Sequence, residues 1–150
     1  MPSFNQGEYE VAMTPDFVAA VETHFTTNMG TSFPGVPLVY DNSVQPDTVE
    51  VYVSINVIAG DTFPCGIVED SKSRNVGILQ VEVFTQKDTG AGEARSKAYA
   101  IGKFFRRLNL SVTSEGFAVF KEPMVNSQGT VRGRHSHLVR IGYYYDFDSS

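Results

Sequence analysis

The sequence predicts an α+β fold in which a long helix and an N-terminal helix pack on an antiparallel or mixed β-sheet. Residues 48–58 alternate apolar and polar side chains with a period of two, which is typical of a strand with one buried face. Residues 93–108 carry apolar side chains at helical spacing. The chain then closes on an aromatic strand, residues 138–147, whose apolar positions again alternate.

Length and composition indicate a globular protein. The chain has 150 residues, which is long enough for one domain to bury a real core. Hydrophobic residues make up 41% and charged residues 19%, as expected for a folded rather than a disordered chain. We therefore expect a single domain over residues 1–150, with residues 1–12 as a flexible arm and residues 13–148 as the folded α+β part.

Charge and cysteine content exclude several classes of protein. The formal net charge of −5 argues against a general affinity for nucleic acid or anionic membrane. Cys65 is the single cysteine, so neither an internal disulfide nor a cysteine-based metal site can form. Residues 1–10 do not resemble a signal peptide, and no apolar run approaches the ~20 residues that span a bilayer. We expect a soluble protein made in a reducing compartment, with no membrane partner.

The first helix has a clear start in the sequence. Thr14 supplies a capping hydroxyl, Pro15 suits the first helical position, and Asp16 complements the helix dipole. The apolar side of this helix consists of Phe17, Val18, Val21 and Phe25. The pattern predicts that the helix ends near Gly30.

The segments after this helix alternate loops and strands. A loop is expected at residues 32–37, a short extended segment at 36–40 and a turn at 41–47, before the strand at 48–58. Residues 59–73 form a long connection to the next strand. That strand, residues 74–84, shifts its apolar phase between Ile78 and Val81, which predicts either a bulge or burial on both faces.

The C-terminal half begins with a polar glycine loop at residues 85–92. The long helix follows, with an apolar stripe of Ala94, Ala98, Ile101, Phe105 and Leu108. Short extended segments at 110–113 and 117–120 and a loop at 121–133 precede the closing strand. The order is α, β, β, α, β, β. Because a hairpin-like connection joins the two central strands, we expect them to pair antiparallel, with the long helix packed across the sheet.

No residue pattern indicates catalysis. Cys65 is remote in sequence from every histidine, and the sequence contains no Gly-x-Ser-x-Gly elbow. A glycine turn precedes the long helix at residues 90–93, but it lacks the lysine of a phosphate-binding loop, so we interpret it as a flexible capping turn. We therefore predict a protein that is not an enzyme and has no cofactor.

The histidines and the C-terminal acids also have plain interpretations. His135 and His137 would share one face of a strand, but no third metal ligand lies nearby in sequence, so we predict no metal site. His24 is expected to be exposed or to cap a helix. Asp146 and Asp148 are expected to be solvated near the end of the chain.

Two segments are candidate interaction surfaces. The first is a basic strip, either a solvated loop and strand face or a surface that meets DNA or an acidic partner; contacts to nucleic acid would be to phosphates. It consists of Arg132, Arg134, His135 and Arg140, and residues 132–137 are expected to be its most exposed part. The second is the connection at residues 59–73, which either folds back on its own sheet or packs on an adjacent subunit. Its apolar residues are Phe63, Pro64, Ile67 and Val68.

Taken in order, these segments resemble a known family. The early helix at 17–25 is followed by Val36-Pro37-Leu38-Val39-Tyr40-Asp41-Asn42, then by the strand at 49–58 and by Gly77-Ile78-Leu79-Gln80-Val81-Glu82-Val83-Phe84. The turn Thr89-Gly90-Ala91-Gly92 leads into the helix that ends with Phe104-Phe105-Arg106, and the strand at 139–147 completes the pattern. Over roughly residues 14–147, this order is similar to that of the tail terminator (tail-completion) proteins of long-tailed bacteriophages.

The resemblance implies a structural role in the virion. Tail terminators of this kind form a homo-oligomeric ring, usually hexameric, that caps the tail tube at its head-proximal end and provides the head–tail joining surface. The implied partners are the tail-tube protein, head–tail connector proteins and DNA that passes through the lumen without specific binding. Assembly would take place in the host cytoplasm, without cofactor or chemistry.

Three alternatives stay open at this stage. Neighbouring neck and tail components, such as a head–tail connector or a tail-tube protein, share similar α+β folds. A small nucleic-acid-binding module would use the basic strip. A small hydrolase or ligand-binding domain would need a pocket with convergent polar groups, for which the sequence gives no sign.

Overall fold

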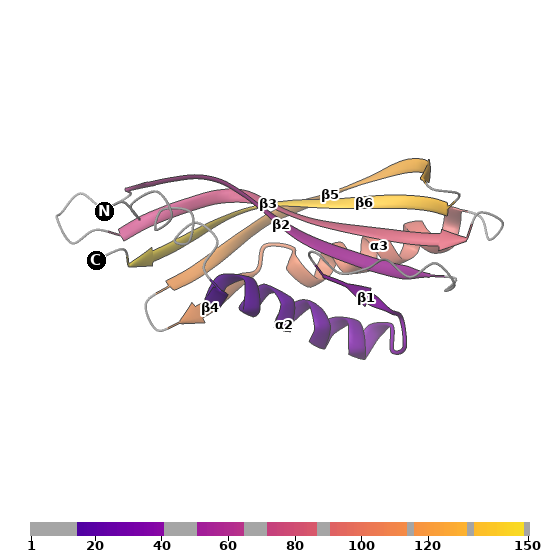
Figure 1. The fold of residues 1–150 in the computed structure, drawn as a ribbon, viewed down its shortest axis with the longest axis horizontal. Coiled ribbons are helices and arrows are strands. Elements are labelled where there is room, and N and C mark those ends of the chain that lie inside the picture. The colour runs from indigo at the N-terminus through magenta and orange to yellow at the C-terminus, as the bar shows by residue number, and fades with distance from the viewer. Residues whose placement is uncertain are drawn as a thin grey trace, which may run out of the picture.

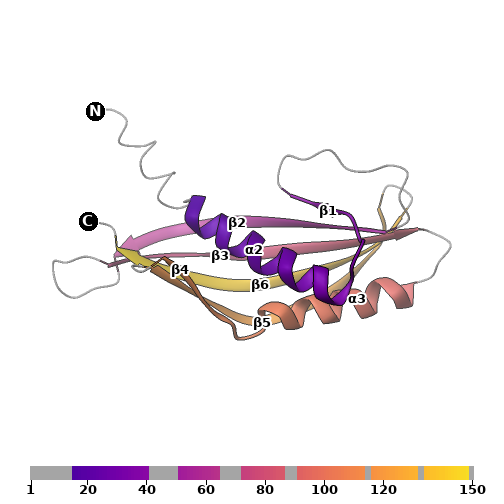
Figure 2. The same ribbon diagram turned by 90° about the horizontal axis from the view of Figure 1, so that it is seen from below.

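The computed structural model describes residues 15–40, 51–64, 72–86, 91–113, 116–131 and 134–148. These residues form two helices and a six-stranded, strongly curled sheet (Figure 1). The helices are α2 (Pro15–Ser32) and α3 (Ala91–Phe105). Both lie on the same face of the sheet, and no described helix covers the other face (Figures 1 and 2).

The sheet is mixed, as the sequence predicted. Its strands are β1 (Leu38–Val39), β2 (Tyr52–Pro64), β3 (Lys72–Gln86), β4 (Asn109–Thr113), β5 (Gly116–Val131) and β6 (Arg134–Asp148). They are arranged in the order β1-β2-β3-β6-β5-β4. The short β1 pairs with β2 in parallel, and every other neighbouring pair is antiparallel.

The core forms between the helices and the face of the sheet that they cover. Most of the two predicted apolar stripes is buried there: Phe17, Val21 and Phe25 of α2, and Ala94, Ala98, Ile101 and Phe105 of α3. Val18 and Leu108, the other predicted members, are only partly buried, and Met29 of α2 joins the core. The ring of Phe17 stacks on Tyr145 of β6 at 4.7 Å and tilts against Tyr143 at 4.9 Å. The closing aromatic strand is thus the centre of the core, which confirms the predicted burial of its alternating residues.

Two predicted loops are in fact strand. The connection expected at residues 59–73 is shorter, because β2 continues to Pro64 and β3 begins at Lys72. The loop expected at residues 121–133 belongs to β5, which pairs with β6 from Gly116 to Val131. Both segments are polar and largely exposed on one face, so cross-strand hydrogen bonds rather than apolar burial hold them in the sheet.

The predicted irregularity lies in a different strand. β3 keeps an unbroken register with β6 from Lys72 to Gln86, so it contains no bulge toward that neighbour. The register shift is in β2, between Ala59 and Thr62. The change of apolar phase in β3 has a different cause: Leu79, Val81 and Val83 face the core, whereas Ile78 is 40% exposed on the opposite face.

Candidate assembly surface

The face of the sheet that lacks helices carries exposed apolar side chains. Strand alternation separates them from the core: in β2, Val57 is buried and Ile58 is 48% exposed, and in β5, Ala118 is buried and Phe117 is 42% exposed. Among the described residues, the large hydrophobic side chains that stay exposed on this face are Ile58, Phe63, Ile78, Phe117 and Met124. We call this set the open face.

One row of the open face crosses four strands. Phe63 of β2 is opposite Arg74 of β3, Arg74 is opposite Asp146 of β6, and Asp146 is opposite Phe117 of β5. Arg74 donates two hydrogen bonds to the Asp146 carboxylate, at 2.7 and 2.8 Å, and its guanidinium lies 3.9 Å from the ring centroid of Tyr144. An ion pair flanked by two exposed phenylalanines therefore forms what we call the Phe63–Phe117 row.

This row corrects the expectation for Asp146. Its side chain is not solvated: the residue is only 6% exposed and is engaged by both nitrogens that Arg74 presents. A bidentate pair of this kind fixes the orientation of both side chains, so the surface is organised before any partner arrives. Asp148, two residues on, is exposed as predicted.

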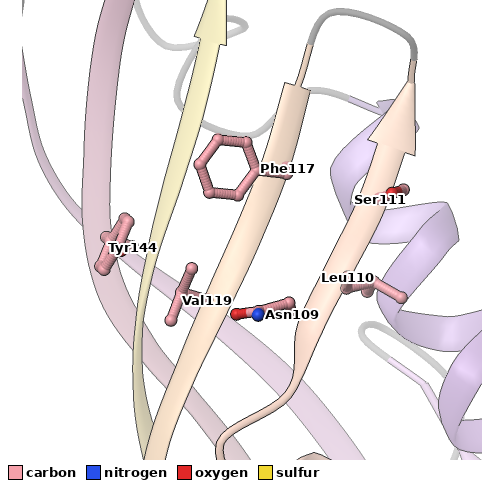
Figure 3. A pocket seen from close by; sticks show the side chains of 6 residues that line it. All are labelled: Asn109, Leu110, Ser111, Phe117, Val119 and Tyr144. Atoms are coloured by element: carbon pink, nitrogen blue, oxygen red, sulfur yellow. The ribbon is translucent and has the colours of Figure 1, made fainter.

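A shallow hollow of about 590 Å³ continues the row toward the edge strand β4 (Figure 3). Its lining residues are Asn109, Leu110, Ser111, Phe117, Val119 and Tyr144. The rings of Phe117 and Tyr144 and the side chain of Val119 give it an apolar floor. It contains no titratable group apart from the Tyr144 phenol, so the hollow suits a side chain of a partner better than a chemical reaction.

A buried polar cluster supports the end of the sheet that bears Phe63. Asn75 is fully buried, and its amide donates to the Gly60 carbonyl oxygen at 3.1 Å and to Thr62 Oγ1 at 3.1 Å. Tyr143 Oη donates to Asn75 Oδ1 at 2.8 Å, and burial raises the pKa of this phenol above its usual value. Asn75 thus pairs with the groups at the bulge in β2, beyond which the strand continues to Phe63 and Pro64.

The sequence did not single out Asn75 or Tyr143 as structural determinants. The available signal was Asn75 itself, because it is a polar residue among the β3 side chains that face the core. A buried amide requires hydrogen-bond partners. Phe63 and Pro64, which the sequence singled out as candidate interface residues, are exposed, and they lie in a strand rather than in a loop. Ile67, Val68 and Cys65 lie outside the described residues.

The predicted basic strip is divided between the two faces of the sheet. Arg134 and Arg140 are on the open face, because each is an even number of residues from Asp146 along β6 and so points to the same side of the sheet. Arg134 lies over the ring of Tyr52 at 5.2 Å, and Arg140 is exposed. His135 points to the other face of the sheet, and Arg132 lies outside the described residues. The described members of the strip, Arg134, His135 and Arg140, therefore do not form one continuous patch.

The expectation that residues 132–137 are the part of the closing strand most exposed to a partner is wrong for Ser136 and His137. Ser136 is fully buried, and its hydroxyl donates to Glu82 at 2.9 Å. His137 is 2% exposed, and neither of its ring nitrogens has a hydrogen-bond partner in the described part of the chain. Burial, together with the charges of Arg95 and His135, lowers the pKa of His137 below 6.5. This histidine is a neutral core residue.

His24 does cap a helix, but not its own. Its Nε2 donates to the carbonyl oxygen of Phe104 at 2.7 Å, in the last turn of α3. This hydrogen bond satisfies one of the four terminal carbonyl groups of α3 and joins the two helices. No group of three or more metal-ligating side chains occurs among the described residues, and no helix among them is both long and apolar enough to cross a membrane.

Comparison with known proteins gives this architecture a family. A family model described as phage tail terminator protein matches residues 16–143, which include both helices and all six strands in whole or in part. The chain belongs to the phage tail terminator family. It is therefore a structural component of a phage-type tail, and the other components of the tail are its partners. No protein of curated function matches the terminator.

Solved structures share the fold at low sequence identity. One chain superposes on the terminator with a TM-score of 0.66 at 19% identity, covering 90% of the terminator and 95% of that chain. A second belongs to a structure entitled virion of native gene transfer agent particle, with a TM-score of 0.52 at 15% identity, covering 94% of the terminator and 99% of that chain. The shared fold extends over nearly the whole length of both.

Proposed function

We propose that the terminator forms a homo-oligomeric, hexameric ring that caps the tail tube at its head-proximal end and provides the surface to which the head joins. The open face carries this proposal. Tyr52 and Phe84 are buried on this face of the sheet, but the rest of the face is left for another protein to cover. It bears Ile58, Ile78 and Met124 as well as the Phe63–Phe117 row.

The Phe63–Phe117 row has the composition of an interface centre. Aromatic residues and arginine are enriched where partner proteins bind, and they contribute most when they are held rigidly. The Asp146 carboxylate fixes the Arg74 side chain by hydrogen bonding, and the backbones of both phenylalanines are fixed by strand pairing. We assign the subunit interface to this row together with Pro64, Ile67 and Val68, the further apolar residues of the predicted contact segment.

Passing DNA would meet cations on the open face. Arg140 is exposed there, and Arg134 and Arg132 belong to the same sequence strip. Contacts with phosphates would be weak and independent of base sequence, which suits a channel through which DNA moves. A head–tail connector or tail-tube role would use the same open face, so the position in the tail is part of the test.

Mass and symmetry test the ring. We expect light scattering of the purified terminator to give the mass of a closed oligomer and negative-stain images to show a ring with a central hole. Gold-labelled antibody should bind where the tail meets the head. A terminator that stays monomeric at all accessible concentrations, or label along the whole tube, would contradict the proposal.

A pair of variants tests the interface. Phe117→Glu places a charge at the β5 end of the row and should shift the oligomer to monomer, because a buried unpaired carboxylate opposes association. Ala19→Glu makes the same change in charge at an exposed position of α2, away from the open face, and should leave the oligomer intact. Unfolding by urea checks that both variants fold. Equal association of the two would remove the row from the interface.

A further inference from the structure

Helix α3 presents a line of exposed side chains that its own fold does not use. Arg95, Tyr99 and Lys103 are four residues apart, so they follow one side of the helix at intervals of about 6 Å. All three are exposed, and Tyr99 is 56% exposed. The sheet contacts a different side of α3, through Ala98 and Ile101. We call this line the α3 stripe.

Helix α2 also leaves the α3 stripe uncovered. The two helices meet where His24 donates to the Phe104 carbonyl oxygen, and Lys97 lies over the ring of Phe33 at 5.3 Å. Residues 97 and 104 are on the flank of α3 opposite to the stripe, given a rotation of 100° per residue. The stripe therefore lies on the side of α3 away from α2, with Arg95 near enough to β6 for its charge to act on His137.

The charges of the α3 stripe are uncompensated. Glu93 is the single acid of α3, and it pairs with Lys97 at 3.6 Å on the other flank. In the described part of the chain, neither Arg95 nor Lys103 has an ion-pair partner. Two positive charges thus flank one exposed tyrosine, a residue type enriched at the centres of protein interfaces.

The opposite end of the molecule has complementary chemistry. Along the long axis, β2 ends far from α3, as both ribbon views show (Figures 1 and 2). There Asp61 is exposed, Phe63 is 43% exposed and Pro64 is exposed.

We infer that the α3 stripe of one subunit binds the β2 end of a second copy of this chain. Tyr99 packs against Phe63 and Pro64 of the neighbour, while Arg95 and Lys103 attract its Asp61 carboxylate. The inference rests on the proposed oligomeric assembly and names the two surfaces that meet in it. The contact is heterologous, because a basic surface cannot bind itself, and a heterologous contact closes into a ring when its rotation allows.

Charge reversal with mixing tests the contact. One protein carries Arg95→Glu and Lys103→Glu, and a second carries Asp61→Lys. Each alone would place like charges against each other, so we expect its apparent dissociation constant to rise by at least about tenfold over that of the original chain. Mixed in equal amounts, the two proteins present opposite charges at every contact and should recover the original oligomer, as should a chain with all three changes.

The controls separate this inference from the proposed function. Ala19→Glu adds a negative charge at an exposed position of α2, outside the stripe and away from the open face, and should leave association unchanged. A ring that persists in the Arg95→Glu and Lys103→Glu protein would overturn the inference and leave the proposed ring standing. Failure of the mixture to recover the oligomer would also overturn it. An original chain that is monomeric throughout would overturn both.

Discussion

Gly77 of β3 occupies a position with no room for a side chain. A Cβ there would meet Tyr143 Oη at 2.6 Å and would also collide with the Ile58 carbonyl oxygen. We expect Gly77→Ala to lower the free energy of unfolding by about 1–3 kcal/mol, since the rigid backbone of β2 cannot give way. Urea unfolding measures the loss.

Gly92 provides the control for that substitution. A Cβ at Gly92 would have no neighbour within 4 Å, and the residue lies in the first turn of α3. Gly92→Ala should preserve stability or raise it by up to about 1 kcal/mol, because alanine has fewer unfolded conformations than glycine. A loss of stability in Gly92→Ala as large as that in Gly77→Ala would contradict the steric account.

His137 should make stability depend on pH. Its pKa in the folded protein is lowered from 6.5, first by burial and then by the charges of Arg95 and His135. The unfolded chain therefore binds a proton before the folded one does, so the free energy of unfolding should fall as the pH drops below 6.5.

Urea midpoints at about pH 7.5 and pH 5 measure that dependence. His137→Leu removes the group that titrates and should flatten this part of the profile. His135→Gln removes a neighbouring histidine on the same strand and should leave most of the slope. An unchanged profile in His137→Leu would assign the dependence to other groups.

At the scale of one element, the bend in β2 depends on Asn75. Its amide donates to Gly60 and Asp61 carbonyl oxygens and to Thr62, and it accepts from Tyr143. Asn75→Ala leaves the buried Tyr143 hydroxyl without this partner and removes the hydrogen bonds to the bulge, so we expect a loss of roughly 1–3 kcal/mol.

Hydrogen exchange locates the effect of that change. Amides from residue 61 to residue 64 should exchange faster in Asn75→Ala, because the bulge loses its support. Asn126→Ala removes an exposed asparagine of β5 and should change neither stability nor exchange. Uniformly faster exchange through β2 and β3 would mean that Asn75 supports the sheet as a whole rather than the bulge.

The elements with a strong apolar period were predictable, and those without one were not. The stripes of α2 and α3 and the closing strand were identified because burial repeats along each of them. Residues 121–131 contain Lys121, Glu122, Pro123 and Gly129 and show no such repeat, yet β6 holds them by main-chain hydrogen bonds. Pairing of this kind depends on the neighbouring strand and leaves little trace in the strand's own sequence.

The same limit applies to the assembly surface. Phe63 and Pro64 could be singled out because apolar residues in a polar segment are conspicuous. The Phe63–Phe117 row could not, because Arg74 and Asp146 are 72 residues apart and meet only through the register of β3 and β6. Proximity along the sequence was also misleading, since His135 and Arg134 point to opposite faces of β6.

At the scale of the whole molecule, the two kinds of contact respond differently to salt. Contact between the α3 stripe and Asp61 of a second copy is screened as ionic strength rises, since the Debye length falls from about 10 Å at 0.1 M to about 3 Å at 1 M. Burial of the Phe63–Phe117 row is not weakened in this way. We expect the oligomer to dissociate more readily at about 0.5 M NaCl than at 0.1 M.

Light scattering over a salt series measures that response, and the charge-reversed protein serves as its reference. The Arg95→Glu and Lys103→Glu protein lacks the screened attraction and should show a smaller or inverted dependence on salt. Identical salt profiles for the two proteins would mean that apolar burial alone controls association.

The position of β6 has a consequence for how the molecule forms. It is the last strand in the sequence, yet it lies between β3 and β5, and it pairs residues as distant as Lys72 and Asp148. Until β6 is synthesised, β3 and β5 each lack a neighbour, and the core lacks Tyr143 and Tyr145. Folding is therefore expected to be slow and to wait for β6, which delays the appearance of both contact surfaces until that strand has paired.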